Sequence, residues 1–304
     1  MGDRPSATIA TVALRKTAER GKDKLYKAAD TILRNVYVDN ILESVESREA
    51  ALRLSQDIDK LIAPRNFAVK KWLKAPVVLT KSYCLSSING IYDPLGLISP
   101  FTVKGKILLR KIWGEKLGWD DTLPDAMREQ WFQFFNELTD IASICFPRCI
   151  KPEDAEPNTR PTLVVFSDGS EQAFGAVAYA RYLLKDSRYA CRLIASKNRV
   201  APLQIISIVR LELSGAVLNK RLTCYIKKEM RLSFEREYHI IDSEIVRAMI
   251  QKQSYGFQTF AFTRIGEIQS ATNPQDWWWC KGELNVGDLI TRGERPSELS
   301  VDST

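Results

Sequence analysis

The chain has 304 residues, of which 45% are hydrophobic and 27% charged, so it can form sizeable hydrophobic cores. Lysine and arginine outnumber aspartate and glutamate by 44 to 37, and this formal charge of +7 is compatible with a polyanionic partner. Because we find no signal peptide and no apolar run of the ~18 residues that a membrane span needs, we expect an intracellular protein of the cytoplasm or nucleus, without membrane contact.

The first half of the chain shows mostly helical patterns. Residues 35–44 predict a tight hairpin with an Asp-Asn turn, and residues 67–73 are typical of a strand. The segment 85–100 contains two prolines and two glycines among apolar residues, which predicts a structured connector. Helices are predicted where apolar residues recur three and four positions apart, over residues 8–34 and 46–62, near 101–118 and near 124–144.

The second half begins after a segment with the composition of a linker. Residues 151–162 contain three prolines and five charges, and we place a domain boundary there. The order of the elements after it indicates an α/β or mixed α+β layer fold. These elements are predicted strands at 162–167, 174–183, 189–196, 237–241 and 258–263, helices at 203–230 and 243–253, and a strand–helix unit from Trp277 to Arg292.

Two aspartates come directly at the ends of predicted buried strands. Asp168 follows the apolar run 163–166, and Asp242 ends the run 238–242. Acids at such positions can converge if the strands are neighbours, since ligand sites in open α/β sheets lie beyond the strand ends. The alternative for each is a turn or N-cap aspartate, and Asp242 does precede a predicted helix.

Two further acids have unusual surroundings. Glu212 shares a helix face with small and apolar residues, so its carboxylate needs a partner, which is a metal, a lysine or arginine, or a hydrogen-bond network. Asn285 can cap a short helix, which makes Asp288 the third helical residue and favours an acid there through the helix dipole. In the sharper interpretation, Asp288 faces the other three acids.

Four carboxylates gathered in one place repel each other unless cations neutralise them. Hard oxygen ligands suit Mg²⁺ or Mn²⁺, and two such ions form the clamp that hydrolyses phosphodiesters. This chemistry requires no histidine or cysteine nucleophile, which agrees with a chain whose one histidine is His239.

The order Asp168, Glu212, Asp242, Asp288 resembles the D-E-D-D set of retroviral-type ribonuclease H domains. More specifically, residues 160–293 resemble the RNase H region of BEL/Pao retrotransposon polyproteins. The matching stretches are "FSDGSEQAFGAVAY", "SIVRLELSGAVL", "IIDSEIVRAMI" and "RIGEIQSATNPQDWWWCKGELNVGDLITRG". Residues 36–72 look like the end of the reverse-transcriptase palm, and residues 87–121 resemble the connecting region of the same family.

The resemblance implies a mixed five-stranded RNase H-like sheet flanked by helices, an α/β (mixed α+β) fold. The implied domains are a truncated palm and thumb remnant in residues 1–80, a connection region in 81–155 and the RNase H-like domain in 156–304. The implied activity is cleavage of RNA in RNA–DNA hybrids with two Mg²⁺ or Mn²⁺ ions, and other parts of a pol polyprotein are candidate partners. The implied catalytic and metal-binding residues are Asp168, Glu212, Asp242 and Asp288.

The chain departs from the family pattern at three places. The paired palm aspartates read Asp39-Asn40 here, after Tyr37, and the chain begins only 38 residues before Asp39, so we expect no DNA synthesis. Residues 285–288 read Asn-Val-Gly-Asp where the family usually has Asn-Pro-Ala-Asp. Residues 277–280 replace a stretch that usually carries a basic residue and a proline, so nuclease activity does not follow from four acids alone.

The basic residues cluster in residues 14–27 and 104–116. Each cluster is either a surface that contacts duplex phosphates or a solvated helix face. Candidate nucleic-acid contacts are Lys104, Lys106, Arg110 and Lys111. Three functions therefore compete: an RNase H-type endonuclease, a catalytically dead nucleic-acid-binding remnant, and an interaction scaffold. The scaffold predicts that each acid is paired with a lysine or arginine.

Overall fold

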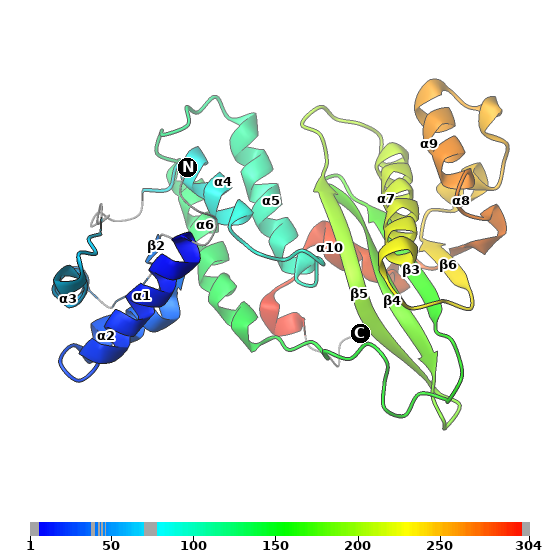
Figure 1. Ribbon diagram of the computed structural model, residues 1–304. Helices are drawn as coiled ribbons and strands as arrows, with labels where there is room; N and C mark the ends of the chain where they lie inside the picture. Colours follow the sequence, from blue (N-terminus) through cyan, green and yellow to red (C-terminus); the bar gives the residue numbers. More distant parts are fainter. Residues whose placement is uncertain are drawn as a thin grey trace. The chain divides into compact units, whose positions relative to one another are not determined.

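The computed structural model describes residues 6–37, 40, 41, 43, 45, 47–69 and 78–299. The chain forms two compact units, Met1–Val78 and Leu79–Thr304 (Figure 1). Among the described residues, no helix combines the length and the apolar character that crossing a bilayer would require.

The first unit is helical and has its own core, which includes Ala28, Ile32 and Ile58. The single helix predicted over 8–34 is wrong, because the chain turns between α1 and α2. Gly21 ends α1 against α3, where a Cβ would lie 2.0 Å from Leu61 Cδ1, and glycine is also a weak helix former. The elements are α1 (Ser6–Gly21), α2 (Tyr26–Asn35), β1 (Val36–Tyr37), β2 (Asn40–Ile41) and α3 (Arg48–Ile62).

The predicted hairpin of this unit is confirmed. Strands β1 and β2 are antiparallel, and Tyr37 pairs with Asn40. Asp39, the remaining palm aspartate of the resemblance, lies outside the described residues. Of the strand predicted at 67–73, residues 67–69 have no regular structure and the others lie outside the described residues.

The second unit begins with helices α4 (Lys81–Asn89), α5 (Ser99–Gly114) and α6 (Asp125–Leu138). The predicted connector is partly helical, since residues 85–89 complete α4, which Thr80 caps by accepting a hydrogen bond from Tyr83 N–H. The aromatic rings of Phe101 and Phe134 stack at the centre of the core of these helices.

A mixed five-stranded sheet follows, as predicted, with the order β5-β4-β3-β6-β7. Strands β3, β4 and β5 are antiparallel, and β6 runs parallel to β3 and to β7. The strands are β3 (Thr162–Gly169), β4 (Ala173–Leu183), β5 (Tyr189–Val200), β6 (Glu237–Ile241) and β7 (Trp277–Trp279).

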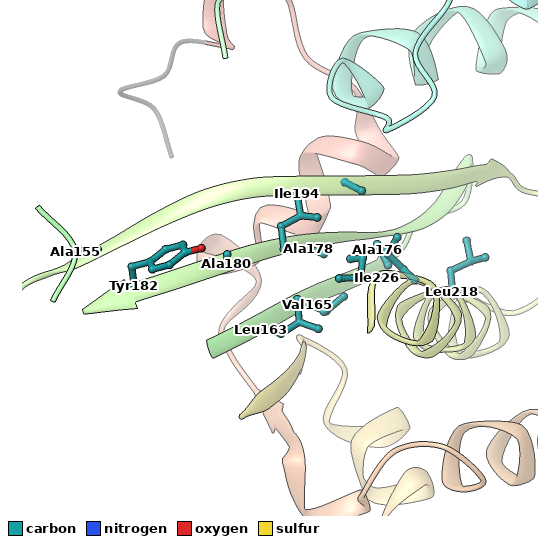
Figure 2. Packing of buried hydrophobic residues seen from close by; sticks show 12 residues of the cluster. Ala155, Leu163, Val165, Ala176, Ala178, Ala180, Tyr182, Ile194, Leu218 and Ile226 are labelled. Carbon is teal, nitrogen blue, oxygen red and sulfur yellow. The ribbon is translucent and has the colours of Figure 1, made fainter. Parts of the chain in front are cut away.

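Helix α7 (Ile208–Glu229) covers one face of the sheet (Figure 1). Its residues Leu218 and Ile226 pack against Leu163 and Val165 of β3, and Figure 2 shows these side chains between the helix and the strands. Because side chains alternate along a strand, Phe166 and Asp168 belong to the opposite face. The short helix α10 (Leu289–Arg292) packs on that opposite face.

The strand predicted at 258–263 is wrong, because these residues lie at the start of α9 (Thr259–Gln269). Phe260 and Phe262 alternate like strand residues over a short window. Ile265 and Ile268 extend the pattern with helical spacing and are fully buried in the core beside α7. Helix α8 (Glu244–Ile250) completes this side of the sheet.

Candidate active site

Asp168 lies at the end of the central strand β3, where it pairs with Gly175 of β4. The residue is 4% exposed, and the hydroxyl of Thr291 donates a hydrogen bond to its carboxylate. Burial is the largest cause that raises the pKa of Asp168, and the negative charge of Asp242 raises it further. The carboxylate therefore has a high electrostatic energy in its ionised form, which a cation would lower.

Asp242 follows β6, the parallel neighbour of β3, so both aspartates lie at the same edge of the sheet. The N-cap of α8 is Ser243, whose side chain accepts from Val246 N–H. The carboxylate of Asp242 is thus not used as a helix cap. Its main-chain carbonyl accepts a hydrogen bond from Trp279 Nε1 at 2.9 Å, which connects β7 to the end of β6.

Asp288 is the third residue of a single 3-10 turn, η6 (Val286–Asp288). As the sequence predicted, Asn285 caps this turn, its Oδ1 accepting from Gly287 N–H at 3.0 Å. The Nδ2 of the buried Asn285 donates to the Ser167 carbonyl at 3.1 Å. Asn285 therefore attaches the Asp288 segment to the residue that precedes Asp168.

The three aspartates converge. Asp168, Asp242 and Asp288 each offer a carboxylate oxygen, and these atoms lie within 4.8 Å of one another. The pKa of Asp288 is raised to about 6, first by burial and then by the charge of Asp168. Asp288 Oδ1 is buried and has no hydrogen-bond partner.

Glu212 is not part of this three-residue group, but it lies beside it in the first turns of α7. Its pKa is raised to about 7, mainly by burial and further by the charges of Asp242 and Asp168, against a hydrogen bond with Ser243 that lowers it. Its Oε2 is buried without a hydrogen-bond partner. The expectation of a carboxylate on a small and apolar helix face is confirmed, and Gly215 of that face packs on the Asp168 main chain.

Positive charge is scarce around these four acids. In the part of the chain that the structure describes, Asp168, Glu212 and Asp242 form no ion pair with lysine or arginine, and Asp288 pairs with the mostly exposed Arg292 at 3.2 Å. The atoms that could bind a metal are all carboxylate oxygens. Two of them, Glu212 Oε2 and Asp288 Oδ1, are buried without a hydrogen-bond partner. Such a set fits a hard divalent cation such as Mg²⁺ or Mn²⁺.

His239 belongs to the core beneath this site. Its ring is fully buried, stacks on Trp277 with centroids 4.7 Å apart, and shares a hydrogen bond of 2.6 Å between Nδ1 and Asn219 Oδ1. Burial lowers the pKa of His239 to about 3, so the ring is neutral at physiological pH. Asn219 Nδ2 also donates to the Val165 carbonyl at 2.8 Å, so these side chains connect α7, β3 and β6.

Sequence reasoning did not identify Asn219 or Thr291. Asn219 is a fully buried polar residue whose helical neighbours include Ala216 and Leu222, and a polar residue on an apolar helix face is a detectable signal of a structural hydrogen bond. Thr291 carries no such signal, because its contact with Asp168 spans 123 residues.

The four basic residues proposed to contact nucleic acid have different surroundings on α5. Lys104 pairs with Glu137, Lys106 Nζ donates to Asn198 Oδ1 at 2.8 Å, and an Arg110 N–H donates to the Pro202 carbonyl at 2.7 Å. Lys111 is exposed. Three of the four side chains therefore make contacts within the protein, and their role toward nucleic acid stays a prediction.

A mixed five-stranded sheet in this order, with acidic side chains gathered at its edge, defines an RNase H-like domain. The model of the family described as "Pao retrotransposon-like RNaseH-like domain" matches residues 80–243, more than half of the chain. The chain therefore belongs to this family, and the resemblance seen in the sequence is confirmed. No curated protein matches the sequence.

Several solved structures are similar to parts of the chain. The N-terminal RNase H domain of Rv2228c from Mycobacterium tuberculosis is 14% identical, with a TM-score of 0.29, over 43% of this chain and 91% of that one. RNase H1 from Halobacterium salinarum is 10% identical, with a TM-score of 0.25, over 44% and 91%. Prototype foamy virus protease–reverse transcriptase is 13% identical, with a TM-score of 0.24, over 81% and 35%.

Proposed function

We propose that this chain is a metal-dependent endonuclease of the RNase H type, which cleaves the RNA strand of RNA–DNA hybrids. The observation that carries the proposal is the convergence of Asp168, Asp242 and Asp288 at one sheet edge, where no described lysine or arginine pairs with Asp168 or Asp242. Glu212, with its unpartnered buried oxygen, is the fourth acid of the proposed site.

In this proposal the four carboxylates hold two Mg²⁺ or Mn²⁺ ions. Bound ions would supply activation of water and stabilisation of the leaving oxygen. The role of the protein is to place the carboxylates before the substrate arrives. The Thr291 hydroxyl orients the Asp168 carboxylate, and Asn285 holds the Asp288 turn against β3.

The family and the chemistry of the acids support the proposed substrate class. A hybrid duplex would be bound through its phosphates and 2′-hydroxyls, without reading of bases. Lys111 on α5 is the exposed candidate for a phosphate contact. We further propose the division into 1–80, 81–155 and 156–304, with no polymerase activity, since Asn40 provides an amide where two-metal chemistry needs a carboxylate.

The test is hydrolysis of an end-labelled RNA–DNA hybrid in Mg²⁺ or Mn²⁺. Wild-type protein is expected to cleave the RNA strand, and Asp168→Asn to be inactive. Asp186→Asn is the matched control, because Asp186 is exposed in the β4–β5 turn and pairs locally with Arg188 at 2.7 Å. Equal cleavage by wild type and Asp168→Asn would overturn the proposal.

The same experiment separates the two other functions. A nucleic-acid-binding remnant would bind the hybrid in a salt-dependent manner but cleave it with neither metal. A scaffold would bind the hybrid negligibly. The scaffold is the less supported of the two, since it predicts a cationic partner for each acid, and the described residues provide an ion pair to Asp288 alone among the four.

A further inference from the structure

Asp288 lies at the start of a very short helix. Helix α10 has four residues, and the turn η6 before it has three. Isolated helices of this length are unstable in water, because helix nucleation is costly. The position of Asp288 therefore depends on contacts that other elements make with α10.

Asn198 of β5 joins α10 to the helix α5 of the preceding region. Its Nδ2 donates to the Ile290 carbonyl at 3.0 Å and to the Ser99 carbonyl at 3.3 Å, while its Oδ1 accepts from Lys106 Nζ at 2.8 Å. Asn198 is 7% exposed, so water competes little for these bonds. The buried amide of Asn198 thus forms hydrogen bonds with residues of both helices, α5 and α10.

The chain that leaves α10 also packs on α5. Gly293 has φ +86°, and a Cβ there would lie 2.5 Å from Lys104 Cγ and 3.2 Å from Val103 Cγ1. The next residue, Glu294, donates its N–H to the Pro100 carbonyl at 2.9 Å. The first turns of α5 therefore contact the residues that follow α10 (Figure 1), while Asn198 of β5 bonds to the Ile290 carbonyl within α10.

Other contacts of α10 reach the sheet and the acidic site. Ile290 is fully buried against Val177 and Tyr179 of β4. Thr291, the residue after the Asn198-bonded carbonyl, donates its hydroxyl to Asp168. Adjacent residues of α10 thus contact Asn198 and Asp168, and a shift of one contact would be transmitted to the other.

We infer that Asn198 and Lys106 are positioning residues of the metal site, which hold α10 so that Asp288 and Thr291 face Asp168. Helix α5 then contributes to the geometry of the RNase H-like site, in addition to connecting domains. This inference rests on the proposed function, because it assigns Asn198 and Lys106 to that same site.

The experiment measures Mn²⁺ binding by the full-length protein without nucleic acid, from the electron paramagnetic resonance signal of free Mn²⁺. Asn198→Ala is expected to weaken Mn²⁺ binding about tenfold, which is typical when a residue that orients a metal ligand is removed. In the hybrid-cleavage assay, the Mn²⁺ concentration for half-maximal rate is expected to rise by the same factor, with an unchanged KM for the hybrid.

Lys106→Met provides a milder variant that keeps both amide donations of Asn198. It is expected to weaken Mn²⁺ binding about threefold, the equivalent of one hydrogen bond. Ile226→Val is the matched control, because Ile226 is a fully buried core residue near the C-terminal end of α7, away from Glu212. It lowers stability without touching α10, and its Mn²⁺ binding is expected to equal that of wild type.

The outcomes separate the inference from the proposed function. A wild-type protein that neither binds Mn²⁺ nor cleaves the hybrid would overturn both. A wild-type protein that does both, with Asn198→Ala and Lys106→Met indistinguishable from Ile226→Val, would overturn the inference alone. If Asn198→Ala does not fold, Mn²⁺ binding by Lys106→Met decides the question.

Discussion

Gly215 of α7 lies directly against the main chain of Asp168, so that a Cβ at Gly215 would be 2.5 Å from the Asp168 carbonyl oxygen. On the same contact, a Cβ at Gly169 would be 2.3 Å from the Glu212 nitrogen. These two glycines allow α7 and β3 to approach until Glu212 lies beside Asp168. Any larger residue would separate the two main chains.

Gly215→Ala is therefore expected to lower the free energy of unfolding by about 1–3 kcal/mol, because the added methyl group overlaps main-chain atoms that cannot rotate away. In an open helix the same change would stabilise by up to about 1 kcal/mol. Urea denaturation measures the effect, with Ser214→Ala on the same helix as the control. A Gly215→Ala protein as stable as wild type would show that the contact is looser than the geometry indicates.

Glu212→Gln is expected to stabilise the metal-free protein above pH 7. The pKa of Glu212 is raised from 4.5 to about 7, so the folded protein binds the proton more tightly than the unfolded chain does. Stability from this group therefore rises as the pH falls from above 7 toward 4.5, and it is lowest when Glu212 is charged. The gain from Glu212→Gln at pH 8 is expected to be about 1–3 kcal/mol.

Urea denaturation with a chelator at pH 8 and pH 5.5 checks this expectation. Glu171→Gln, at an exposed position in the β3–β4 turn, is the control. The hypothesis of a strained carboxylate fails if both variants show the same pH dependence as wild type.

His239 is expected to change the pH dependence of stability in the direction opposite to that of Glu212. Its pKa is lowered from 6.5 to about 3 by burial, so the unfolded chain binds more protons between these values. Stability is consequently lost as the pH falls below 6.5, by about 2 kcal/mol at pH 5. His239→Gln is expected to lower the free energy of unfolding at pH 7, because the stacking on Trp277 is lost. Between pH 7 and pH 5, however, the free energy of unfolding of this variant should fall less than that of the wild type. Equal losses in the two proteins would contradict a buried neutral ring.

Asn285→Ala is expected to destabilise the protein by about 2–4 kcal/mol, since it removes a cap and the hydrogen bond that Asn285 donates to the buried Ser167 carbonyl. Asn285→Asp keeps the oxygen that accepts from Gly287 N–H but adds a charge next to Asp288. Its stability deficit is therefore expected to be larger at pH 8 than at pH 5 in thermal denaturation. A deficit that does not change with pH would argue that residue 285 is remote from the acids.

Lys111→Gln is expected to weaken hybrid binding for all sequences and to reduce the slope of log K against log salt by about 1, as for one lost phosphate contact. Arg53→Gln, on α3 of the first unit, is the control for a loss of one positive charge. Fluorescence anisotropy with a labelled hybrid, at several salt concentrations, measures both slopes. Identical slopes in all three proteins would exclude Lys111 as a phosphate contact.

Much of the RNase H-like sheet could be predicted from the sequence, because its central strands β3 and β4 are long and mostly apolar. The prediction at 237–241 coincides with β6, and Asp168 and Asp242 were expected at its strand ends. The strand predicted at 258–263 was wrong because a six-residue alternation fits two structures equally well. The contacts that Ile265 and Ile268 make with the core beside α7 favour the helix, because they require helical spacing.

The sequence by itself predicted the five strands of the sheet, with one additional strand that is a helix, and a group of carboxylates as the candidate site, because hydrophobic spacing and residue type are local properties. Only the tertiary structure decided that three aspartates meet within 4.8 Å, that Glu212 lies beside them with a buried oxygen that no described residue hydrogen-bonds, and that Thr291 binds Asp168. These contacts join residues far apart in the chain, and they depend on the close approach of main chains at Gly169 and Gly215. Spacing along the sequence contains no measure of that distance.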